Sequence, residues 1–216
     1  MTSKLLIFVI FVSFYSYSQE TYHFDTLLTY NNEVNDSIIK THQRFINSKD
    51  NSFFLSVTTK NDTSSLYFKD CGKIVHSAQI SKALLNRVDT ISISNSYNID
   101  LFKPKNKIFI EQLEDSIIQG LRYNHYVLNL KNKRKAERLN KKGKLLTEHF
   151  LTKKNNSPTV THFLHPSESK NLIGTLFMYF TKDKLNTSKL ILKSSKDVNL
   201  YLKRDELSFF QKKQLE

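Results

Sequence analysis

Basic side chains gathered between residues 131 and 144 are the feature of this sequence best suited to binding an anion. This basic segment holds eight Lys or Arg residues and one acid, Glu137, so it carries a net charge of +7 within a chain of +13. In a helix, Arg134, Arg138 and Lys142 would share one face. The composition predicts an anion-docking patch or, alternatively, a solvated connection between strands. The candidate anion-binding residues are Lys131, Lys133, Arg134, Lys135, Arg138, Lys141, Lys142 and Lys144.

Nucleic acid and nucleotide cofactors are not predicted partners. No aromatic residue interleaves with the charges of the basic segment, whereas proteins that bind single strands stack bases on such rings. The chain has only four glycines, which argues against Gly-rich phosphate loops and dinucleotide-binding fingerprints. We therefore expect no cofactor.

The histidines predict no metal site from their spacing. His162 and His165 are three residues apart in a predicted strand, so their side chains would point to opposite faces and would not share one ion. Four others fall one to a strand and would have to converge in three dimensions: His23, His76, His125 and His149.

One acidic cluster lies near a predicted strand end. Glu111 and Glu114 would face opposite ways on a strand, and Glu114 with Asp115 is expected at the edge of a turn. Paired carboxylates serve glycoside hydrolysis, but a sugar cleft usually has aromatic platforms and this chain has no Trp. No G-x-S-x-G motif is present. No catalytic residue is assigned.

The first eighteen residues have the pattern of a cleavable secretory signal. Lys4 precedes an apolar run over residues 5–12, and Ser16 and Ser18 place small residues at −3 and −1 before Gln19. The run is too short for a comfortable membrane span, and we expect no span in the mature chain. Without this leader, 198 residues with 32 basic and 20 acidic side chains would remain, a net charge of +12. We expect export to the periplasm, the cell surface or the medium.

Most of the remaining chain alternates apolar and polar residues in short runs, which predicts β-strands. We expect one β-rich domain over residues 19–216, built on a strongly curved antiparallel sheet that is a half-barrel, a barrel or a sandwich. The predicted strands cover residues 22–30, 53–60, 66–69, 73–80, 87–94, 107–113, 122–130, 145–152, 159–165, 176–181, 189–193 and 198–203.

Two segments are less regular. Residues 37–47 fit a helix or a strand, and the five turn-forming residues that follow favour a hairpin with 53–60. The basic segment breaks the β pattern, with Glu137 and Lys141 as a helical pair and Gly143 as a stop signal. A short helix or loop is therefore expected near residues 131–143.

The order of several short pieces resembles secreted, β-rich cell-envelope proteins of unknown function. These pieces include Ser16-Tyr17-Ser18-Gln19, Tyr67-Phe68-Lys69-Asp70, Tyr123-Asn124-His125-Tyr126 and Asn171-Leu172-Ile173-Gly174. The last is similar to the signature of the GLPGLI family, although it lacks the Pro. The resemblance implies export and a curved antiparallel sheet, and it transfers no catalytic residue.

Three functional hypotheses remain open at this stage. The first is a non-enzymatic binding or envelope-associated protein, with an apolar or amphiphilic ligand on the concave sheet and the basic segment on an anionic surface. The second is a hydrolase with a His and carboxylate site. The third is a structural subunit that offers its sheet edges to a partner. The sequence does not indicate an oligomeric state.

Overall fold

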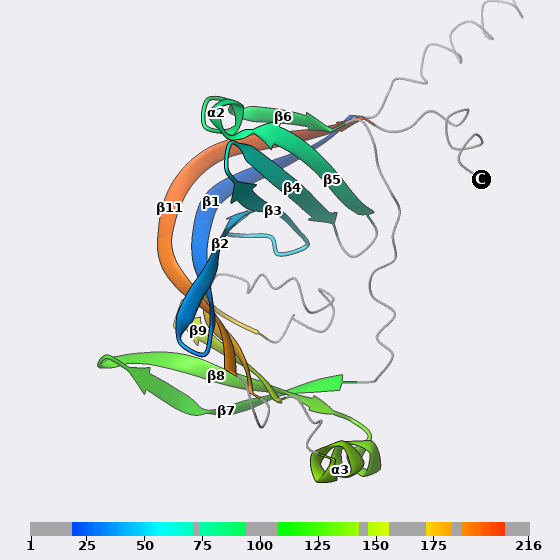
Figure 1. Cartoon of the computed structure of the whole chain (residues 1–216), viewed down its shortest axis with the longest axis vertical. Helices are drawn as coiled ribbons and strands as arrows, with labels where there is room; N and C mark the ends of the chain where they lie inside the picture. Colours follow the sequence, from blue (N-terminus) through cyan, green and yellow to red (C-terminus); the bar gives the residue numbers. More distant parts are fainter. Residues whose placement is uncertain are drawn as a thin grey trace, which may run out of the picture.

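A computed structural model describes residues 19–70, 74–93, 108–142, 147–155, 172–182 and 187–205. They form eleven strands and two short helices (Figure 1). In chain order these are β1 (Gln19–Val34), β2 (Ser37–Ile46), β3 (Phe53–Lys60), β4 (Thr63–Asp70), β5 (Ile74–Ser81), α2 (Lys82–Leu85), β6 (Thr90–Ile93), β7 (Ile108–Ile118), β8 (Leu121–Leu130), α3 (Lys133–Lys141), β9 (Thr147–Lys153), β10 (Leu176–Lys182) and β11 (Thr187–Asp205).

All eleven strands belong to one open sheet. The order across it is β5-β4-β3-β2-β1-β11-β10-β9-β8-β7, and neighbours in this order are antiparallel. The short β6 is the exception, because it pairs parallel to the end of β11. The mainly β, antiparallel prediction is confirmed. The sheet does not close, so the barrel alternative is wrong.

The two central strands, β1 and β11, give the sheet its curvature. They run side by side through a wide arc (Figure 1), and their register shifts between Phe24 and Thr26 and between Thr29 and Tyr30. Such bulges bend a strand and increase its twist. The prediction of two strands at 189–193 and 198–203 is wrong. The exposed polar stretch between them continues the ladder, with Ser195 opposite Leu28 and Lys196 opposite Leu27.

The turn between β1 and β2 is made by asparagine and aspartate, without a glycine. Asn35 and Asp36 both have positive φ (48° and 64°) between β1 and β2, as a two-residue hairpin turn requires. The predicted hairpin of residues 37–47 with 53–60 is confirmed as β2 with β3. The predicted turn at Glu114 and Asp115 is wrong, since both lie at a bulge inside β7. The predicted strand at 159–165 lies outside the described residues.

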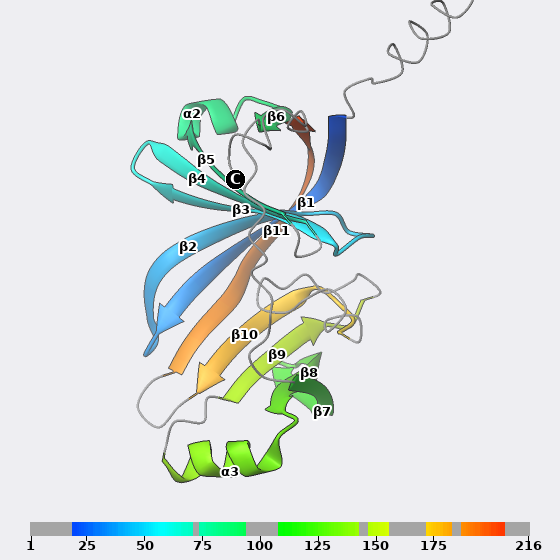
Figure 2. The same ribbon diagram turned by 90° about the vertical axis from the view of Figure 1, so that its right-hand side faces the viewer.

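Two hydrophobic clusters stabilise opposite faces of the sheet. Along β3, Phe53, Leu55 and Val57 belong to one cluster, with β6 and the upper ends of β1 and β11. Phe54, between them, belongs to the other cluster. That second cluster reaches from β3 across β1 and β11 to β8, β9 and β10, strands whose order can be followed in Figure 2. We call the face that carries it the concave face. The alternation places every odd residue of β3 on one face and every even residue on the other.

Candidate functional site: a concave pocket and a basic helix

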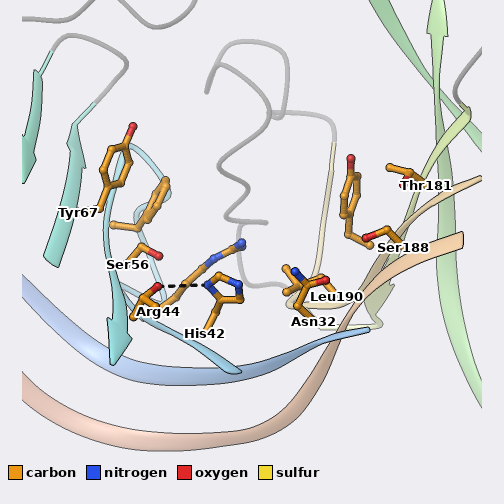
Figure 3. A pocket seen from close by; sticks show the side chains of 11 residues that line it. Asn32, His42, Arg44, Ser56, Tyr67, Thr181, Ser188 and Leu190 are labelled. Carbon is orange, nitrogen blue, oxygen red and sulfur yellow. Dashed lines mark hydrogen bonds between the residues drawn. The ribbon is translucent and has the colours of Figure 1, made fainter. Parts of the chain in front are cut away.

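A pocket of about 480 Å³ lies on the concave face of the sheet. Its described walls come from β1, β2, β3, β4, β10 and β11. The pocket is therefore built from strands near both ends of the chain. Figure 3 shows Tyr67 on one wall and Thr181 on the other, facing across the space above His42 and Arg44. The lining joins apolar and aromatic surface to hydroxyl, amide and imidazole groups: Asn32, His42, Arg44, Phe54, Ser56, Thr58, Tyr67, Tyr179, Thr181, Ser188 and Leu190.

Arg44 places a cation in this wall. Its side chain belongs to a residue only 3% exposed, and the guanidinium carbon lies 5.0 Å from the ring centroid of Tyr30 and 6.0 Å from that of Phe54. Burial lowers the pKa of Arg44, and the nearby Tyr30 opposes that shift. Arginine still remains charged at neutral pH. Desolvated cation–π contacts contribute about 2 kcal/mol each.

Lys69 is a second cation beside the same aromatic ring. It is 2% exposed, and its Nζ lies 5.8 Å from the ring centroid of Phe54. Phe54 therefore stands between two buried cations, one from β2 and one from β4. No run of charge in the sequence predicts this pair of buried cations.

Two tyrosines connect the pocket to the rest of the sheet. Tyr30 donates a buried hydrogen bond of 3.0 Å to the carbonyl oxygen of Leu176, which joins β1 to β10 across β11. Burial raises the pKa of Tyr30 to about 12, so the phenol stays protonated as a donor. Tyr179 donates a hydrogen bond of 2.9 Å to Glu148 Oε2. Burial, together with the charge of that carboxylate, raises the pKa of Tyr179.

Among the described residues that line the pocket, His42 is the one that titrates near physiological pH. Its Nδ1 lies 3.5 Å from Thr58 Oγ1. Burial lowers the pKa of His42, and the positive charges of Lys40 and Arg44 lower it further. The imidazole is therefore neutral at pH 7, and a bound anion would favour its protonated form.

Within the basic segment Lys133–Lys141 form the helix α3, which is one of the two alternatives predicted there. Asn132 caps it, because its Oδ1 accepts a hydrogen bond of 3.0 Å from the backbone N–H of Lys135. Ala136 and Leu139 are half-buried. Lys135 is also half-buried, and Lys144 lies outside the described residues. Six of the predicted anion-binding residues are exposed: Lys131, Lys133, Arg134, Arg138, Lys141 and Lys142.

The structure separates α3 from the pocket. The helix lies at the end of the molecule formed by β7 to β10 (Figures 1 and 2), and none of its residues lines the pocket. Composition predicts the basic segment as an anion-binding region, but it does not predict Arg44. The sequence holds only a weak indication of its position. Arg44 is two residues before Ile46 in β2, so it points to the same face as this residue of the concave cluster.

Two of the dispersed histidines do converge. His125 Nε2 lies 3.0 Å from His149 Nδ1, and His125 Nδ1 lies 3.1 Å from Ser116 Oγ. The predicted acidic cluster does not gather into one site: Glu111 accepts a hydrogen bond from Asn129 and Asp115 pairs with Lys154. His162 and His165 lie outside the described residues, as does the side chain of His76.

Comparisons with known proteins add little to this geometry. No family model matches the sequence, so the resemblance to the GLPGLI family is not confirmed, and no curated protein is significantly similar. One similar solved structure is a "putative outer membrane lipoprotein-sorting protein domain" from Vibrio parahaemolyticus. It is 10% identical, with a TM-score of 0.30, over 80% of this chain and 85% of that one. A score this low supports no conclusion about fold or function.

The lengths and apolar content of the described helices were compared with those of membrane spans. None of them within the described ranges is long and apolar enough to cross a bilayer.

Proposed function

We propose that this chain is an exported, non-enzymatic binding protein that holds an amphiphile with an anionic head group in the concave pocket. The basic segment then contacts an anionic surface such as a membrane of the cell envelope. Export rests on the leader-like pattern of residues 1–18. Anionic-surface contact rests on the exposed cations of α3.

The observation that carries the pocket half is the position of Arg44. A guanidinium held between the rings of Tyr30 and Phe54 has little freedom left to lose, so it is preorganised for a carboxylate, sulfonate or phosphate. Phe54, Leu190 and the faces of Tyr67 and Tyr179 supply apolar contact for the rest of the molecule. A cavity of about 480 Å³ is within the usual size range for small-molecule sites.

Hydrolysis in this pocket has less support. Residues next to each other on a strand point to opposite faces. Tyr179 and Thr181 line the pocket, whereas His149 stacks on Phe180, between them. The Ser116, His125 and His149 group therefore lies on the other face of the sheet, out of reach of a molecule in the pocket.

The proposal can be tested with two fluorescent probes that have the same acyl tail and different head groups. An N-acyl taurine carries a sulfonate head group, and the matching N-acyl ethanolamide is neutral. We expect the sulfonate probe to bind more tightly, and Arg44→Gln to weaken it by about tenfold to thirtyfold while the neutral probe changes less than threefold, because only the anion uses the guanidinium.

Arg122→Gln is the matched control, since Arg122 is exposed at the start of β8, outside the pocket lining. It should leave both probes unchanged. Circular dichroism of each variant checks folding, and Arg44→Lys, which keeps the charge, should retain part of the preference. Equal affinity of the two probes for the unmodified protein would contradict an anionic head group. Binding of neither probe would contradict the amphiphile pocket itself.

A further inference from the structure

A pair of imidazoles on the convex face of the sheet is not used by the proposed pocket. His125 comes from β8 and His149 from the neighbouring β9, and each directly precedes a residue of the concave cluster: Tyr126 follows His125 and Phe150 follows His149. The two histidines are diagonal neighbours, because His125 is opposite Leu151 and His149 is opposite Val127. Both side chains are only partly buried, so they are accessible to small ions.

The two facing nitrogens have a spacing suited to chelation. His125 Nε2 and His149 Nδ1 are 3.0 Å apart. Metal–nitrogen bonds of about 2.05 Å that span this distance would meet at about 94°. That angle is close to the 90° of square-planar and tetragonal coordination, and smaller than the 109° of a tetrahedral site. Tetragonal nitrogen and oxygen sites favour Cu(II), which is also the divalent first-row ion that such ligands bind most tightly.

Neighbouring residues hold both rings in place. Ser116 Oγ is 3.1 Å from His125 Nδ1, which occupies one nitrogen of that ring and directs the other toward His149. The ring of His149 stacks on Phe180, with centroids 4.6 Å apart and an interplanar angle of 4°.

We propose that His125 and His149 form a bidentate site for Cu(II) on the convex face of the sheet. In the proposed site these two nitrogens are the protein ligands and water completes the coordination. Within the described ranges no group of three or more His, Cys, Asp or Glu converges. A small rotation of the two rings replaces the hydrogen bond between them with two bonds to the metal, and the proton of that hydrogen bond moves to the other nitrogen of its ring or to water. Such a site is expected to bind with micromolar affinity and to exchange its ion readily.

Titration with CuCl₂ tests the site in the full mature chain. We expect one saturable site by calorimetry, and an electron paramagnetic resonance spectrum with superhyperfine structure from two imidazole nitrogens. His125→Gln and His149→Gln should each weaken binding at least tenfold. The double variant reports copper binding by all other ligands, the chain terminus included. Its isotherm is subtracted from that of the unmodified protein.

His23→Gln is the matched control, because His23 is also a sheet histidine that stacks on a ring, Tyr201, at 4.7 Å. It should not change the affinity. Removing either partner leaves one imidazole, so His149→Gln alone decides the matter if His125→Gln does not fold. Unchanged affinity in a folded His149→Gln variant, or a spectrum with a single nitrogen, would overturn the proposal. Tighter binding of Zn(II) than of Cu(II) would also overturn the tetragonal assignment.

Discussion

Arg44 and the helix α3 are two solutions to placing positive charge on one protein. Arg44 is a single cation, 3% exposed, fixed between two aromatic rings on the concave face. The basic segment carries many cations on the outside of a nine-residue helix, and six of its candidate residues are exposed. One arrangement concentrates charge in a desolvated position, and the other spreads it over a wet surface.

The difference in environment predicts a difference in specificity. Charge interactions in a partly desolvated pocket are strong and barely screened by salt, whereas exposed charges lose most of their reach within about 10 Å at 0.1 M salt. We therefore expect the pocket to select its ligand by shape and head group. The helix should respond to the charge density of a surface, with little selectivity among anions.

The largest expected effect is on the surface half of this comparison. Each basic residue near an anionic membrane contributes about fivefold in affinity, so removing four should weaken binding by several hundredfold. The variant is Lys133→Gln, Arg134→Gln, Arg138→Gln and Lys141→Gln together, and the measurement is co-sedimentation with phosphatidylglycerol vesicles at 50 mM salt.

The same variant should bind the sulfonate probe like the unmodified protein, because none of the four residues lines the pocket. Raising the salt to 0.5 M should abolish vesicle binding by the unmodified protein and change probe binding less than threefold. Vesicle binding that survives both the four substitutions and the salt would mean that another surface makes the contact.

The basic segment can be predicted from the sequence and the environment of Arg44 cannot, for a physical reason. The basic segment is contiguous, so composition alone predicts its charge, while its helix was one of two alternatives. Arg44 gains its character from Tyr30 on the adjacent strand and from Phe54, which registers opposite Ile46 rather than Arg44 itself. The register of β2 against both neighbouring strands creates that environment, and no pattern within a single strand predicts it.

The same reasoning explains which strands were predicted well. β3 and β8 alternate or carry runs of apolar residues, and their bounds were close. β11 was divided in two because residues 193–197 are polar on both faces, and only the hydrogen bonds to β1 hold them in the strand. The pairing of His125 with His149 was likewise invisible, since it depends on the register of β8 and β9.

A second test concerns the stability of the pocket half. Tyr30→Phe removes the buried hydrogen bond to the carbonyl of Leu176 and leaves that oxygen without this donor. We expect a loss of about 2 kcal/mol in the free energy of unfolding, measured by urea denaturation. Tyr201→Phe, on a half-buried tyrosine that stacks on His23, is the control and should cost much less. Equal losses would show that the Tyr30 hydrogen bond has no special role.

A third, smaller effect is the pH dependence of the pocket. The pKa of His42 is lowered in the free protein, so protonation occurs only below its usual value of about 6.5. A bound sulfonate favours the protonated ring, and affinity should therefore rise about threefold to tenfold from pH 7.5 to pH 5.5.

His42→Gln should make that profile flat, and the neutral probe should show no rise. For the same reason His42 favours the folded state less as the pH falls: its folded pKa is below its unfolded one, so protonation below about pH 6.5 stabilises the unfolded chain. Affinity must thus be measured well below the melting temperature. An affinity that falls on acidification would place the head group away from His42.

The smallest effect asks whether the two regions are coupled at all. Asn132→Ala removes the cap that accepts from the N–H of Lys135, and losing such a cap costs about 1 kcal/mol of helix stability. We expect amide exchange within α3 to speed up about fivefold, with the melting temperature and the probe affinity unchanged, because α3 contacts the sheet mainly through β8. Faster exchange in β1 or β2, or a weaker sulfonate probe, would show that the helix and the pocket act as one unit. The buried cation and the exposed cations would then be two ends of one binding device rather than independent sites.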